Sequence, residues 1–263
     1  MQSAIGNRQS ATRIGSVPYL NSKPLIYGIE DRVSLHAPSQ LAELLHGGKL
    51  DAALVPIVEC FAHDEYVVLE GASISCRGPV FSVFLAHRGP LPKVKKIAID
   101  QASRTSVLLL DVILREKLRL NAELSPLPSY DFEGPPDTML LIGNPAIRFR
   151  TTRTDYQFYD LGQAWWELTG LPFVFAAWAI RPSASKPGLT AMLLRAKRAG
   201  VAHVDEIVAR ETEFTAEIRR RYLTQHIRFE LGAEEKRGIA TFRGLLQKSN
   251  PRQPVHDLRY ITG

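Results

Sequence analysis

Residues 13–24 read Arg13-Ile14-Gly15-Ser16-Val17-Pro18-Tyr19-Leu20-Asn21-Ser22-Lys23-Pro24. The stretch begins with the apolar character of a short strand, and its two prolines then fix φ and remove backbone donors. Loops on a rigid scaffold are where binding groups usually sit. The loop predicts a site for a small polar ligand, with hydroxyl, amide and ammonium groups on Ser16, Tyr19, Asn21, Ser22 and Lys23.

The residues that follow this loop have the pattern of an α/β protein. Strands are predicted at residues 14–17, 33–35 and 51–55, with a short helix starting at Pro24 and a second helix over 39–45. The second helix has Ser39 as a candidate N-cap and ends at a glycine pair. This order of strands and helices favours parallel strands joined by helical crossovers.

A second unit of strand, polar loop and helix starts at residue 96, and its helix runs through Leu118. Further strands are predicted at 138–142 and 173–180, and helices near 188–200, 204–226 and 233–247. The apolar runs 80–87 and 173–180 bracket the second unit, so the chain leaves one lobe and later returns to it.

The predicted fold class is therefore α/β, with two lobes and a hinge between the two α/β domains. Lobe 1 is expected to comprise residues 13–86 and 175–263, lobe 2 residues 87–174, and residues 1–12 are expected to form a flexible tail. Small-molecule sites favour such domain interfaces, where closure of the lobes encloses the ligand.

The composition is that of an ordinary globular protein. The 263 residues are 45% hydrophobic and 23% charged, and no run approaches the roughly 18 apolar residues of a membrane span. The first dozen residues lack the apolar stretch of a secretory signal, so we expect a cytoplasmic protein with no membrane partner. The net charge of +6 would by itself be compatible with nucleic-acid binding. The basic residues of the C-terminal third alternate with glutamates, however, so we expect no nucleic-acid partner.

Motifs of several enzyme classes are missing from the sequence. It contains no HExxH, GxSxG, P-loop or GxGxxG, and its seven histidines show no metal-ligand spacing. Cys60 and Cys76 fit neither a CxxC pattern nor a metal site, and we expect two buried thiols. No metal and no cofactor are predicted, and the oligomeric state is left open.

Three further positions are candidates for ligand contacts. Residues 103–106 stand before a helix, where hydroxyls and free N–H groups can bind a carboxylate or a phosphate. Helix capping by Ser103 or Thr105 is the commoner use of such residues and is favoured on the sequence alone. Ser82 lies in an apolar stretch and needs a partner, and Arg77 suits an acidic substrate or a surface salt bridge equally well.

The opening motif resembles the N-terminal signature of the chorismate dehydratases of the futalosine pathway of menaquinone biosynthesis. Further blocks in the same order look like those of this family, together covering about residues 13–247. They are Gly48-Lys49-Leu50-Asp51-Ala52-Ala53-Leu54-Val55-Pro56, Gly78-Pro79-Val80-Phe81-Ser82-Val83, Ser103-Arg104-Thr105-Ser106 and the run from Asp160 to Ala176.

The resemblance implies a type II periplasmic-binding-protein fold used as a cytoplasmic enzyme. It implies the conversion of chorismate to 3-[(1-carboxyvinyl)oxy]benzoate and water. Asn21 and Ser82 match positions that act on the substrate, whereas Ser103, Thr105 and Ser106 match positions that bind a carboxylate.

Ser16, Tyr19, Arg77 and Asn144 complete the predicted substrate-binding set. Asn144 departs from the family pattern, which has an acidic residue there, and an amide can orient a ligand but cannot act as a base. Two alternatives remain: a non-enzymatic binding or sensor protein for a small anion with the same fold, and the related 1,4-dihydroxy-6-naphthoate synthase.

Overall fold

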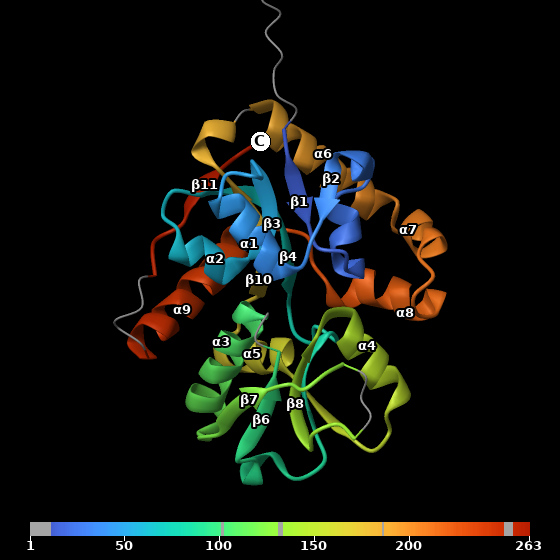
Figure 1. Ribbon diagram of the computed structural model, residues 1–263, viewed down its shortest axis with the longest axis vertical. Coiled ribbons are helices and arrows are strands. Elements are labelled where there is room, and N and C mark those ends of the chain that lie inside the picture. Colours follow the sequence, from blue (N-terminus) through green and yellow to red (C-terminus); the bar gives the residue numbers. More distant parts are fainter. Residues whose placement is uncertain (1–11, 101–102, 131–133, 186, 250–254) are drawn as a thin grey trace, which may run out of the picture.

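The computed structural model describes residues 12–100, 103–130, 134–185, 187–249 and 255–263. The chain forms two lobes, one above the other in Figure 1, and each is built on its own β-sheet. The predicted N-terminal tail, apart from residue 12, lies outside the described residues. None of the helices in the described part is long and apolar enough to cross a membrane.

The first lobe contains a six-stranded sheet with the order β11-β4-β10-β3-β1-β2. Strand β1 pairs in parallel with both β2 and β3, whereas β10 lies antiparallel between β3 and β4. The strands are β1 Ile14–Ser16, β2 Val33–Leu35, β3 Ala52–Pro56, β4 Val67–Cys76, β10 Phe173–Ile180 and β11 Arg259–Ile261.

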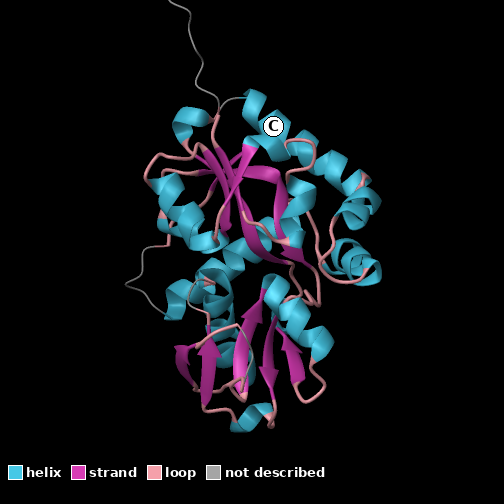
Figure 2. Ribbon diagram, turned by 45° about the vertical axis from the view of Figure 1, so that its right-hand side comes forward, coloured by secondary structure: helices cyan, strands magenta, loops and turns pink. Residues whose placement is uncertain are grey.

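The second lobe contains a five-stranded sheet with the order β7-β6-β8-β5-β9. Strand β6 is parallel to β7 and β8, and β5 runs antiparallel to β8 and β9. The strands are β5 Val83–His87, β6 Lys96–Ile99, β7 Glu123–Pro126, β8 Thr138–Ile142 and β9 Gln157–Asp160. Figure 2 shows helices packed around both sheets.

Helices cover both lobes and continue to the end of the chain. The α-helices are α1 Pro38–His46, α2 Ile57–Ala62, α3 Arg104–Val112, α4 Gly143–Thr152, α5 Leu161–Thr169, α6 Pro187–Ala202, α7 Val204–Arg210, α8 Ala216–Arg221 and α9 Ala233–Ser249. Short 3-10 helices are η1 Leu20–Leu25, η2 Glu30–Arg32, η3 Leu91–Lys93 and η5 Pro182–Ala184, and π-helical turns are η4 Ile113–Leu118 and η6 Tyr222–His226.

The prediction of an α/β fold is confirmed, and the chain crosses between the sheets twice. The chain passes from the first sheet to the second between the end of β4 at Cys76 and the start of β5 at Val83. It returns to the first sheet between α5 and β10. The expected boundary after residue 86 assigns most of β5 to the first lobe, although this strand pairs only in the second sheet. We therefore propose that the crossings lie at residues 77–82 and 170–172.

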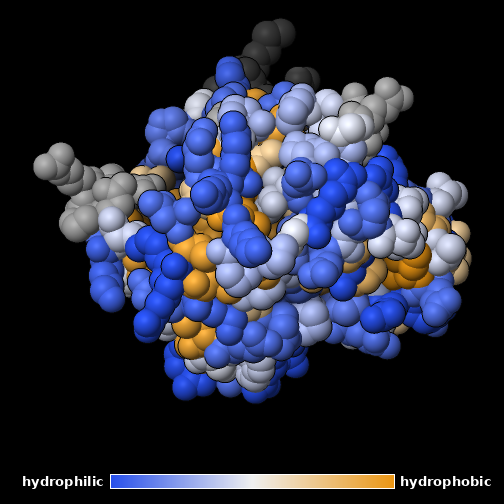
Figure 3. All heavy atoms as spheres, turned by 90° about the horizontal axis from the view of Figure 1, so that it is seen from below, coloured by the Kyte–Doolittle hydropathy of each residue, from blue (hydrophilic) through white to orange (hydrophobic). Residues whose placement is uncertain are grey.

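Buried apolar residues form one large cluster that includes residues of both lobes and a smaller cluster within the second lobe. The strands 138–142 and 173–180 are buried along most of their length, as their apolar sequence indicates. Seen from below, hydrophilic side chains cover most of the molecule and apolar atoms show only in smaller patches (Figure 3). Cys60 and Cys76 are buried free thiols, as predicted, and burial raises the pKa of Cys60 to about 12.

Helix α6 packs directly against η1, the element that carries the polar loop. The contact depends on Gly200, because a Cβ atom at this position would overlap the carbonyl oxygen of Pro24. The close approach of the two backbones fixes where η1 lies relative to the first sheet. The absence of a side chain at Gly200 thus helps to place the loop.

The substitution Gly200→Ala is expected to lower the free energy of unfolding by about 1–3 kcal/mol, since the extra methyl group overpacks this contact. Gly244→Ala is the matched control, because no atom lies within 4 Å of a Cβ there and alanine is the better helix former. Urea denaturation of both variants measures the difference. Equal stability of the two variants would contradict the proposed role of Gly200.

Candidate functional site

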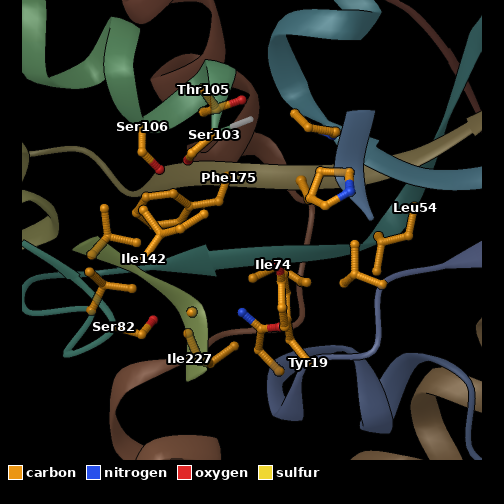
Figure 4. A pocket seen from close by; sticks show the side chains of 18 of the residues that line it. Tyr19, Leu54, Ile74, Ser82, Ser103, Thr105, Ser106, Ile142, Phe175 and Ile227 are labelled. Atoms are coloured by element: carbon orange, nitrogen blue, oxygen red, sulfur yellow. The ribbon is translucent and has the colours of Figure 1, made fainter. Parts of the chain in front are cut away.

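A cavity of about 660 Å³, including the solvent at its mouth, lies where the two lobes meet. Its walls are largely apolar, with polar groups at opposite sides (Figure 4). Lining residues include Tyr19, Asn21, Leu54, Ile74, Val80, Ser82, Ser103, Arg104, Thr105, Ser106, Ile142, Gly143, Phe175 and Ile227. Segments far apart in the sequence therefore form a single site.

The polar loop of the first lobe contributes Tyr19 and Asn21. The loop is held by Ser22, whose buried Oγ lies 2.6 Å from the carbonyl oxygen of Val17 and 2.8 Å from that of Tyr19. Asn21 Nδ2 donates a hydrogen bond to the hydroxyl of Tyr222 at 3.2 Å. Asn21 Oδ1 is buried and has no hydrogen-bond partner among the described residues, so it is available to a ligand.

The first crossing segment brings Ser82 to the cavity. Phe81 has a φ of 69°, and the backbone N–H groups of Val80 and Phe81 donate to the two carboxylate oxygens of Asp160 at 3.0 and 2.8 Å. Ser82 is fully buried, and its carbonyl oxygen accepts from the N–H of Gly143 at 2.8 Å. Ser82 belongs to the apolar run 80–87 of the sequence and lies just before β5.

Tyr222 is a residue of this site that the sequence analysis missed. It lies in η6, and its hydroxyl is 2.7 Å from Ser82 Oγ and 3.2 Å from Asn21 Nδ2. Burial raises the pKa of the Tyr222 hydroxyl well above its usual value. Its segment of sequence looks like a solvated basic helix, so only the three-dimensional contact reveals it.

The second lobe contributes the start of α3. Ser103 is the N-cap residue, yet its side chain makes no capping hydrogen bond, so the favoured capping interpretation is wrong for this residue. Thr105 Oγ1 is buried without a partner among the described residues, and the hydroxyls of Ser103 and Ser106 face the cavity (Figure 4). Unused hydroxyls at a helix N-terminus suit an anionic group such as a carboxylate.

The remaining predicted residues lie outside the cavity lining. Ser16 Oγ is buried and lacks a partner among the described residues, but Ser16 is not one of the residues that line the cavity. Arg77 pairs with Glu234 at 3.5 Å and lies 4.8 Å from the ring centre of Trp166. Its position matches the salt-bridge interpretation.

Asn144 also lies behind the cavity wall, where it connects the lobes. Its Oδ1 accepts from the N–H of Leu20 in η1 at 3.3 Å, and its Nδ2 donates to Glu213. Glu213 also pairs with Arg148 of α4. The amide thus holds the start of α4 against the polar loop and against residues that precede α8.

One group with metal-ligand spacing occurs among the described residues. His46, His63 and Glu65 offer ligand atoms that lie within 4.8 Å of one another. Two of the three side chains are exposed, and none of the three lines the cavity. The cavity walls themselves contain no histidine and no acidic residue among the described residues, and Arg104 is ion-paired with Glu59 at 2.6 Å.

His226 is packed behind the crossing segment. Its Nδ1 lies 3.0 Å from the carbonyl oxygen of Pro79, its ring stacks on Phe81, and Nε2 is buried without a partner among the described residues. Burial lowers the pKa of His226, and the nearby Arg221 and Arg150 lower it further. The neutral ring is therefore the form that fits the folded protein.

The lowered pKa of His226 predicts a loss of stability in acid. As the pH falls below about 6.5, the unfolded chain binds a proton that the folded chain resists, so the free energy of unfolding decreases. The variant His226→Gln should lose less stability between pH 7.5 and 5.5 than the wild type in chemical denaturation. An unchanged acid response in His226→Gln would contradict the assignment.

Comparisons with known proteins identify the family and the fold of this chain. A sequence model described as menaquinone biosynthesis matches residues 12–248. A curated chorismate dehydratase of Thermus thermophilus is 32% identical over 224 residues, which cover 75% of this chain and 80% of the relative.

Solved structures confirm the two-lobed fold. A crystal structure of an Archaeoglobus fulgidus protein matches with a TM-score of 0.72 at 16% identity, covering 92% of this chain and 99% of the other. A Candida albicans protein described as having the generic periplasmic binding protein fold matches with a TM-score of 0.61 at 13% identity, covering 95% and 97%. These two likenesses bear on the fold alone. The family match and the curated relative together show that the chain belongs to the menaquinone biosynthesis family that includes chorismate dehydratase.

Proposed function

We propose that this protein is a chorismate dehydratase, a hydro-lyase that converts chorismate to 3-[(1-carboxyvinyl)oxy]benzoate and water in menaquinone biosynthesis. The observation that carries the proposal is the pairing of Asn21 and Ser82 with the start of α3 across one cavity. The named activity of the curated relative supports the choice of substrate.

The start of α3 is suited to bind a carboxylate of chorismate. The free N–H groups at a helix N-terminus attract negative charge, and the hydroxyls of Ser103, Thr105 and Ser106 add donors at the same place. Thr105 Oγ1 is buried and unpartnered among the described residues, which favours a ligand there over a purely structural role.

The apolar walls are suited to the ring of the substrate. Leu54, Ile74 and Phe175 line the cavity, and Ile74 and Phe175 lie between its two polar sides (Figure 4). Apolar walls of this kind exclude water, which strengthens the hydrogen bonds made to a charged ligand. In the proposed complex the ring lies between α3 and the pair formed by Asn21 and Ser82. Its reacting atoms then lie next to Asn21 and Ser82.

The reaction removes a ring hydroxyl and a ring proton, and the ring becomes aromatic. No histidine and no acidic side chain lines the cavity among the described residues. We therefore assign the role of proton acceptor to the side-chain carboxylate of the substrate itself, with Asn21 and Ser82 orienting this carboxylate and the departing hydroxyl. The ring C–H and ring C–O bonds break, and the carboxylate passes the proton it has taken to the departing hydroxyl, so that water leaves and the product and water together contain all the atoms of the substrate.

Purified protein incubated with chorismate tests the proposal. We expect the loss of one water, seen by mass spectrometry, together with a new benzoate absorbance. Tight binding of another anion without turnover would instead favour a binding or sensor protein. Turnover of a substrate of 1,4-dihydroxy-6-naphthoate synthase without turnover of chorismate would favour that enzyme.

Asn21→Ala and Ser82→Ala should each lower kcat by about 10²-fold or more, as is usual when a donor preorganised for the transition state is removed. Steady-state assays with chorismate measure the effect. Asn121→Ala and Ser129→Ala, which alter exposed residues of the same types, are the matched controls and should keep wild-type kcat. Wild-type turnover by both site variants would reject the assignment.

Thr105→Val should raise KM for chorismate about 5- to 10-fold, because one hydrogen bond to the substrate carboxylate is lost. The variant should fold at least as stably as the wild type, since the hydroxyl it removes has no partner among the described residues. Thermal unfolding checks the second expectation. An unchanged KM would exclude Thr105 from carboxylate binding.

A further inference from the structure

We infer that Tyr222 is a positioning residue that presents Ser82 to the substrate as a hydrogen-bond donor and Asn21 as an acceptor. The inference rests on the proposed function and extends it to a residue that does not line the cavity. Tyr222 acts through its neighbours, because its ring is 1% exposed and lies behind them.

Three segments that are distant in the sequence meet at the Tyr222 hydroxyl. Ser82 comes from the first crossing segment, Asn21 from η1 and Tyr222 from η6. The hydroxyl oxygen is 2.7 Å from Ser82 Oγ and 3.2 Å from Asn21 Nδ2. Both neighbours line the cavity, so the phenol is the link between the two groups proposed to act on chorismate.

The number of protons fixes the direction of each hydrogen bond. The amide nitrogen of Asn21 can only donate, so the phenol oxygen accepts from it. By distance alone either oxygen of the Tyr222–Ser82 pair could donate. The buried phenol proton needs an acceptor, and Ser82 Oγ is its other hydrogen-bonded neighbour among the described residues, so we assign the phenol as the donor and Ser82 Oγ as the acceptor. The Ser82 hydroxyl proton is then free to point into the cavity.

The same chain of hydrogen bonds fixes the orientation of the Asn21 amide. With Nδ2 held by Tyr222, the opposite atom Oδ1 is turned away from the phenol and has no partner among the described residues. This side of the cavity thus offers the Ser82 hydroxyl as a donor and Asn21 Oδ1 as an acceptor. The Ser82 hydroxyl, as the donor, stabilises negative charge on an oxygen of the substrate. Asn21 Oδ1, as the acceptor, binds the hydrogen of the substrate's ring hydroxyl.

Tyr222 keeps its proton throughout the working range of pH. Burial raises the pKa of its hydroxyl above the usual value of about 10, so the neutral phenol is the form present near pH 7. Its role is therefore to orient its neighbours, and proton transfer to or from Tyr222 forms no part of the reaction. The carbonyl oxygen of Tyr222 accepts from the N–H of Ile227 at 3.0 Å, and Ile227 itself lines the cavity.

The variant Tyr222→Phe removes the hydroxyl and keeps the ring. We expect kcat for chorismate to fall about 10- to 30-fold with KM within about 2-fold of the wild type, since the substrate carboxylate site on α3 is untouched. The shape of the kcat profile between pH 6 and 9 should stay the same. Tyr66→Phe is the matched control, because this buried hydroxyl has no partner among the described residues and lies outside the cavity lining.

A double-mutant cycle separates positioning from a structural effect. In the Ser82→Ala background the phenol has lost the hydroxyl that it orients and keeps only the Asn21 amide, so adding Tyr222→Phe should lower kcat by a smaller factor than the same change does in the wild type. An equal cost in both backgrounds would overturn the inference, as would wild-type kcat in Tyr222→Phe. Failure of the wild-type protein to convert chorismate would overturn the proposed function and this inference together, whereas the other two outcomes leave the proposed function standing.

Discussion

The Asp160 carboxylate is the constraint on which the site depends. It accepts the N–H groups of Val80 and Phe81 and, as the N-cap of α5, also that of Gln163 at 3.1 Å. Phe81 has a positive φ, a conformation that costs a non-glycine residue about 1–3 kcal/mol, and these hydrogen bonds offset the cost. Because Ser82 follows directly, the carboxylate determines where the crossing segment presents that hydroxyl.

Polar contacts next to Ser82 join the two lobes. The carbonyl oxygen of Ser82 holds the N–H of Gly143 at the start of α4, and Asn144 next to it holds η1 and Glu213. The start of α4 is thus hydrogen-bonded both to Ser82 of the crossing segment and to η1, and each of these contributes to the cavity. The same few hydrogen bonds hold the second lobe against η1 and the residues before α8 and fix the positions of the polar groups.

The sequence predicts the elements whose pattern is local. The strands 138–142 and 173–180 have the bounds their apolar runs indicate, and the family motifs indicate Asn21 and Ser82. Other features depend on contacts between distant residues and have no local pattern. Tyr222 is 140 positions from Ser82, and Ser103 has the sequence of a cap although its hydroxyl makes no capping bond. Arg77 and Asn144 have chemistry suited to a ligand, and only packing shows their protein partners.

The position of β10 has a consequence for the order in which the protein is made. This strand lies between β3 and β4, yet the whole second sheet is encoded between β4 and β10. During synthesis the five strands of the second sheet all leave the ribosome before the central strand of the first sheet. Until β10 is made, β1, β2 and β3 can pair with one another, whereas β4 has neither of its neighbours, because β10 and β11 both follow it in the chain. The first sheet therefore stays in two parts with exposed edges after all strands of the second sheet have been made.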